Sequence, residues 1–202
     1  GRINEDETMW FDLHLETNAY YFEEFRDKFD EREDAIIDWD AKTDEDSFVT
    51  LTMSSTYWPD EGIQINKKTS KTIFNDLIKE PLLAHTLPVE KFNCNEVAFG
   101  VYFHGHDSCA NHKITIIETG KNKFDIKWSG KIALSYFGEY EFKHPFKFHL
   151  PNAEFDGFHY PKNWSLEKAS DYFNAHFDDF DEYEFVDLNP QSEKREYKFK
   201  KK

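Results

Sequence analysis

The sequence is poor in the residues that mark several large protein classes. Its 202 residues include two cysteines, Cys94 and Cys109, and eight glycines, which do not cluster. Two cysteines cannot build the disulfide framework of a small secreted domain, so they favour two thiols in a reducing compartment such as the cytoplasm. A single Cys94–Cys109 bridge is the alternative. Without clustered glycines, no loop is suited to cradling a phosphate group.

Several sequence motifs are also missing. No segment approaches 18 consecutive apolar residues, so we expect no membrane-spanning helix, and no secretory signal peptide is visible. The chain lacks a P-loop, a Gly-x-Gly-x-x-Gly fingerprint, a Gly-x-Ser-x-Gly elbow, a His-Glu-x-x-His helix and paired Cys-x-x-Cys motifs. These absences argue against P-loop enzymes, dinucleotide oxidoreductases, α/β-hydrolases and the common zinc folds. We therefore favour a protein that is not an enzyme and expect no bound cofactor.

Negative charge dominates the chain and is concentrated near its N-terminus. The formal net charge is -15, and residues 1–60 contain 18 acidic and five basic side chains. Residues 61–150 are nearly balanced, with ten acidic and 12 basic side chains, while residues 151–202 contain 12 and eight. Such a surface repels nucleic acid, so we expect none to bind. It favours association with a basic protein instead.

Aromatic residues are what the chain has in abundance. They make up 18% of it, including 21 Phe and 10 Tyr, which supplies large side chains for a packed core and argues against a disordered chain. No internal repeat or break in composition divides the sequence. We expect a single domain over residues 1–202, with loose residues 1–8 and a basic, frayed tail over residues 188–202.

The hydrophobic pattern changes along the chain from mixed to mainly β. Asn18, Ser70 and Ser165 each precede a segment with helical spacing of apolar residues, so they predict the starts of three helices. Alternating apolar residues predict a strand over residues 9–16.

From residue 95 to residue 150, four strands with short connections predict an antiparallel meander, in which Pro145 indicates an edge strand or a bulge. The sequence therefore predicts an α+β fold, with a mainly antiparallel sheet, a meander in its C-terminal half and about three packed helices.

The segment FHGHDSCANHK, from Phe103 to Lys113, is the most chemically suggestive part of the sequence. On a strand, His104 and His106 would point the same way, and a hairpin would bring Cys109 and His112 close to them. Imidazoles with a thiolate suit zinc or another first-row divalent metal. The His-x-His resembles the cupin family, in which such a pair shares a metal with a glutamate and a later histidine.

The same segment has a second interpretation. Ala110 and Asn111 stand where the cupin glutamate would be expected, so the segment departs from that family. Several of its residues are turn formers, which favours a hairpin tip with solvated histidines: Gly105, Asp107, Ser108 and Asn111.

Two functional hypotheses follow. The first is a non-enzymatic protein-binding module whose acidic side chains meet a basic partner, and in charge and size it resembles bacterial immunity proteins that neutralise toxic nucleases. Its candidate contact residues are Glu23, Glu24, Asp27, Asp30, Glu31, Asp178, Asp179 and Asp181. The alternative is a metal- or small-ligand-binding β protein, or a metalloenzyme, centred on His104, His106, Cys109 and His112.

Overall fold

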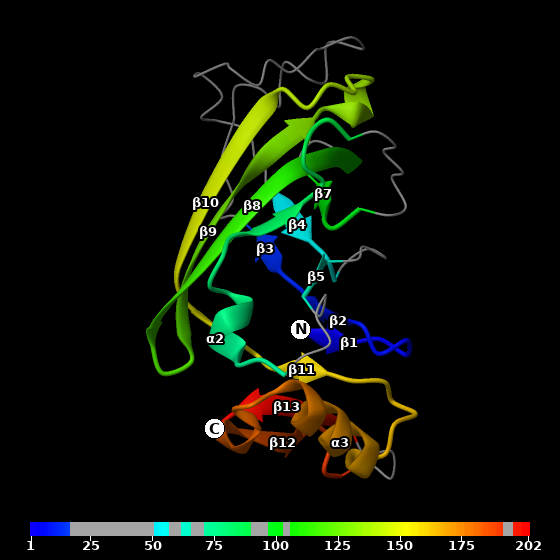
Figure 1. The fold of residues 1–202 in the computed structure, drawn as a ribbon. Coiled ribbons are helices and arrows are strands. Elements are labelled where there is room, and N and C mark those ends of the chain that lie inside the picture. Colours follow the sequence, from blue (N-terminus) through cyan, green and yellow to red (C-terminus); the bar gives the residue numbers. More distant parts are fainter. Residues whose placement is uncertain (17–50, 57–61, 66–70, 90–96, 103–105, 192–195) are drawn as a thin grey trace.

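The fold is mostly β, as seen in a computed structural model that describes residues 1–16, 51–56, 62–65, 71–89, 97–102, 106–191 and 196–202. Strands make up 49% of it and form two sheets, one of which is a half-barrel. In Figure 1 the half-barrel stands above the second sheet. The described residues contain two α-helices, α2 (Phe74–Leu77) and α3 (Leu166–His176). Neither is long and apolar enough to cross a membrane.

The predicted α+β fold with about three packed helices is therefore wrong. The helix expected after Ser70 is reduced to the four residues of α2, because Thr72 before it forms a β-bridge with Phe177 and β6 after it pairs with β8. The helix expected after Asn18 lies outside the described residues. The third prediction holds: the hydroxyl of Ser165 accepts a hydrogen bond from the Lys168 amide at 3.1 Å and caps α3.

The half-barrel is a seven-stranded sheet in the order β10-β9-β8-β7-β4-β3, with β6 paired to β8. All of its strand pairs are antiparallel. Its strands are β3 (His14–Glu16), β4 (Thr52–Ser54), β6 (Leu82–Ala84), β7 (Gly100–Tyr102), β8 (His106–Gly120), β9 (Lys123–Ala133) and β10 (His144–Glu154). Pro145 lies on β10, which ends this order of strands, so the missing amide hydrogen is tolerated there.

The second sheet has six strands in the order β12-β13-β11-β1-β2-β5. The β1–β11 pair is parallel and the other pairs are antiparallel. Its strands are β1 (Arg2–Ile3), β2 (Met9–Phe11), β5 (Ile63–Gln64), β11 (Phe158–His159), β12 (Tyr183–Asp187) and β13 (Tyr197–Lys201). Two short 3-10 helices complete the described elements, η1 (Ser135–Phe137) and η2 (Phe180–Glu182).

Both termini contribute strands to this second sheet, β1 and β13, where the sequence suggested loose residues 1–8 and a frayed tail over residues 188–202. The strand β1 lies between β11 and β2, and β13 lies between β12 and β11. The lysines of the tail alternate with Phe199, which is fully buried. Two of these lysines form ion pairs, Lys198 with Asp156 at 2.7 Å and Lys201 with Glu182 at 3.3 Å. Charge alone suggested a solvated tail, but the alternation belongs to a strand.

Two aromatic-rich cores stabilise the two parts of the molecule. In the lower core, Phe199 stacks on Phe173 at 4.0 Å and on Tyr183 at 4.8 Å between ring centroids. The half-barrel core is filled by Trp128, Phe99 and their aliphatic neighbours. The long strand β9 serves both, since Phe124 belongs to the lower core while Ile126, Trp128 and Ile132 belong to the upper one.

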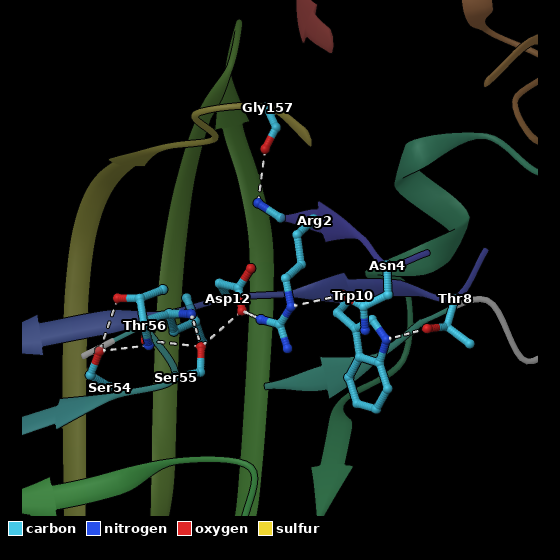
Figure 2. A network of polar contacts seen from close by, with 11 residues as sticks. Arg2, Asn4, Thr8, Trp10, Asp12, Ser54, Ser55, Thr56 and Gly157 are labelled. Carbon is cyan, nitrogen blue, oxygen red and sulfur yellow. Dashed lines mark hydrogen bonds and ion pairs between the residues drawn. The ribbon is translucent and has the colours of Figure 1, made fainter. Parts of the chain in front are cut away.

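A corner at Asp12 and Leu13 carries the chain from one sheet into the other. The expected strand over residues 9–16 is in fact β2 in one sheet and β3 in the other, and β5 and β4 pair with them. Ser55 closes the corner: its amide donates to the Leu13 carbonyl at 3.0 Å, and its hydroxyl accepts from the Leu13 amide at 3.1 Å. Figure 2 shows Asp12 between Ser55 and the guanidinium of Arg2, with which it forms an ion pair.

Gly62 is required at this corner for two reasons. Its φ of +73° lies in the left-handed region, and a Cβ placed there would come within 2.5 Å of the Phe11 carbonyl oxygen. Gly138 has a similar φ of +82°, but a Cβ there would have nothing within 4 Å. Comparing substitutions at the two glycines therefore separates the cost of backbone strain from the cost of a steric collision.

We expect Gly62→Ala to lower the free energy of unfolding by about 2 kcal/mol or more, because strain and collision add. Gly138→Ala, the matched control, should cost about 1 kcal/mol from strain alone. Urea denaturation followed by circular dichroism measures both. Equal losses in the two variants would show that the corner has room for a side chain.

Candidate functional site

Most of the segment FHGHDSCANHK forms a strand rather than a hairpin tip. Residues 106–113 belong to β8, while residues 103–105, and with them His104, lie outside the described residues. The register of β8 against β9 shifts between Ala110 and Lys113, and Asn111 adopts a positive φ of 56°. This bulge accommodates Asn111, one of the turn-forming residues from which the sequence suggested a hairpin tip.

Cys109 is part of the half-barrel core. Its side chain is 1% exposed, and its sulfur donates to the Phe99 carbonyl at 2.9 Å. The residue carries a thiol rather than a disulfide, and Cys94 lies outside the described residues. A thiol buried in apolar surroundings is held in its protonated form, so Cys109 is suited to packing rather than to reaction.

His112 is enclosed by aromatic rings. It is 1% exposed, and its ring centroid lies 5.1 Å from that of Phe99 and 5.9 Å from those of Trp128 and Phe146. The indole N–H of Trp128 donates to Nδ1 of His112 at 3.2 Å, so the imidazole proton lies on Nε2. Burial lowers the pKa of His112 to about 3, and the nearby His85 contributes in the same direction. The imidazole is therefore neutral at physiological pH.

The predicted metal ligands do not converge in the described residues. His106 is exposed on β8, with its ring centroid 5.4 Å from that of Tyr102, whereas Cys109 and His112 are buried. Within the part of the chain that the structure describes, no group of three His, Cys, Asp or Glu side chains is arranged to hold a metal ion.

The predicted acidic contact residues fall into two groups. Five of them lie outside the described residues: Glu23, Glu24, Asp27, Asp30 and Glu31. Of the other three, Asp178 and Asp181 are exposed, and the carbonyl of Asp181 accepts from Nζ of Lys202 at 2.6 Å. Asp179 is half-buried, which raises its pKa, and its carboxylate accepts from the Phe74 amide at 3.4 Å. Asp179 therefore helps to join α2 to the lower core.

The basic tail neutralises much of this acidic stretch. Glu184 lies opposite Lys200 in the β12–β13 pair, and Glu182 forms an ion pair with Lys201. Cross-strand pairs of opposite charge are stabilising. The basic tail and this acidic stretch, which looked independent in the sequence, are therefore partners. Residues 178–187 are thus weaker candidates for binding a basic protein.

A second acidic region surrounds the turn between β1 and β2. Asp6 accepts from the amide and hydroxyl of Thr8 at 3.1 and 2.6 Å, and these bonds lower the pKa of its carboxyl group. The Tyr172 hydroxyl donates to the Glu7 carbonyl at 2.7 Å and so fastens the turn to α3. We call the exposed carboxylates of this turn and of α3 the acidic end: Glu5, Asp6, Glu7, Glu167 and Asp171.

A basic face, which the sequence did not reveal, covers the outside of the half-barrel. Lys113 on β8 and Lys147 on β10 flank Ser129 on β9, and Lys127 and Lys131 lie two residues before and after Ser129. We call the surface formed by these four lysines the lysine face. Each of these lysines occupies an outward position of its strand, so the alternation of the sequence alone could have identified each one separately as outward-facing. Only the strand register shows that they surround one residue.

Comparisons with protein-family models, with curated proteins and with solved structures found no match. The functional argument therefore depends on the chain's own residues.

The burial of His112 predicts a dependence of stability on pH. In the unfolded chain it takes up a proton with its ordinary pKa of 6.5, whereas in the folded protein the pKa is about 3. Its contribution to stability is therefore complete above pH 6.5 and is lost as the pH falls toward 3, at up to about 1.4 kcal/mol per pH unit.

Urea denaturation between pH 7 and pH 4 tests this. His112→Gln should reduce the slope of unfolding free energy against pH by one proton, whereas His149→Gln, at an exposed position, should leave the slope unchanged. The assignment fails if His112→Gln keeps the wild-type slope.

Proposed function

We propose that this protein is a non-enzymatic protein-binding module that uses acidic side chains to engage a basic protein. The observation that carries the proposal is the charge of residues 1–60, which contain 18 acidic and five basic side chains. In this region the acidic end presents three consecutive carboxylates on a turn that a hydrogen bond from Tyr172 and an ion pair with Lys168 hold against α3. A fixed, ionised turn of this kind loses little conformational entropy when a partner binds.

The residues that suggested a metal site in the sequence support the same proposal. Cys109 and His112 are committed to hydrogen bonds inside the half-barrel, while the acidic end is open to solvent. Complementary charge accelerates association and discriminates between partners, as expected for a module of the immunity-protein kind. Because exposed charges are screened by salt, the interaction should also be sensitive to ionic strength.

The proposal predicts a basic partner whose association depends on salt. Basic proteins retained from a lysate by the immobilised chain would be identified, purified and measured one at a time by surface plasmon resonance. We expect the association rate to fall at least about tenfold between 20 and 200 mM salt. A variant with Glu5→Gln, Asp6→Asn and Glu7→Gln should lower that rate further at low salt.

A matched control removes three negative charges from other exposed positions through Glu118→Gln, Glu141→Gln and Glu184→Gln. It should change the association rate much less than the acidic-end variant does. The proposal is contradicted if both variants behave alike, or if no basic protein binds specifically.

A further inference from the structure

The lysine face carries positive charge that the described chain does not neutralise. Among the described residues, none of its four lysines forms an ion pair. Their cross-strand neighbours are the uncharged Ser129, Thr115, Ala110 and Pro145, together with His149 and Leu83. Asp125, a carboxylate at one end of this surface, accepts from the Asn152 amide at 3.2 Å and contacts His149 at 3.4 Å.

Apolar groups border the lysines on the same side of the sheet. Leu83 on β6 lies opposite Lys113 and is 55% exposed, and Ile117 on β8 lies opposite Asp125 and is 44% exposed. Lysine side chains add their own methylene stems to such a surface. Exposed apolar residues surrounded by polar ones are typical of a surface that contacts another protein.

We infer that the lysine face is a second interaction surface, and that it receives an acidic segment of a partner protein. Neighbouring strands lie about 4.8 Å apart and residues two apart on a strand about 6.7 Å, so the Cα atoms of neighbouring lysines around Ser129 lie roughly 8 Å apart. The Cβ atoms of residues i and i+4 of a helix are about 6 Å apart, so long lysine side chains can reach carboxylates at both positions. The partner would therefore present several closely spaced Asp or Glu side chains.

Other anionic partners fit the surface less well. Apart from His149, its outward residues include no aromatic ring on which a nucleic-acid base could stack, and they include no arginine to grip phosphate with two hydrogen bonds. The chain's net charge of -15 would also repel a long nucleic acid or an extended anionic membrane. A short acidic protein segment contacts the lysines and avoids the rest of the surface.

The test uses a fluorescent 12-residue peptide of alternating glutamate and alanine with the full chain. We expect binding at 20 mM salt that weakens steeply by 200 mM, measured by fluorescence anisotropy. A variant with Lys127→Gln, Lys131→Gln and Lys147→Gln should bind at least about tenfold more weakly. The matched control, with Lys71→Gln, Lys79→Gln and Lys121→Gln, removes the same charge at exposed positions elsewhere and should bind like the wild type.

Zero-length carbodiimide cross-linking gives a second readout that locates the peptide. Mass spectrometry should find its carboxylates joined to Lys113, Lys127, Lys131 or Lys147. Cross-links confined to other lysines, or equal affinities in the two variants, would overturn the inference. Preferential binding of an oligonucleotide or of phosphatidylserine vesicles would assign the face to another partner and overturn it too.

A second copy of the chain is the remaining occupant to test. Analytical ultracentrifugation of the chain alone should show no self-association through the lysine face. If the wild type self-associates and the lysine-face variant does not, the face is instead used for self-assembly. This inference does not depend on the proposed function, because the two surfaces have opposite charge and are altered by different variants. Either can fail while the other stands.

Discussion

The corner at Asp12 and Ser55 is the constraint on which the rest of the structure depends. There the chain passes from β2 in the six-stranded sheet to β3 in the half-barrel, and β5 and β4 pair with these two strands in their respective sheets. The bend requires a carboxylate that meets both a hydroxyl and a guanidinium, and a glycine whose missing side chain lets the backbone pass the Phe11 carbonyl. Because β9 also contributes to both cores, neither sheet is a separate unit.

The polar groups of this protein divide between internal and external roles. His112 and Cys109, which look reactive in the sequence, form hydrogen bonds inside the half-barrel in apolar surroundings. Two surfaces of opposite charge lie on the outside, the acidic end beside α3 and the lysine face on the half-barrel. A rigid β framework with segregated surface charge suits recognition of other proteins.

Local signals in the sequence predicted local features of the fold. The cap at Ser165 and the edge position of Pro145 were correct because each depends on one residue and its immediate neighbours. Long-range pairing was not predictable in this way. The tail forms a strand inside its sheet, where it pairs with the acidic β12. The histidine segment forms a strand because it pairs with β7 and β9, although its turn-forming residues suggested a hairpin tip. The lysine face required the register of three strands at once.

Hydrogen exchange followed by mass spectrometry tests most directly whether the corner unites the two sheets. The comparison is between the wild type and an Asp12→Ala variant, in peptides that report on β9 of the half-barrel and on β13 of the other sheet. If the corner couples the sheets, protection should fall together in both peptides of the variant. Loss of protection in only one sheet, with the other unchanged, would contradict the account.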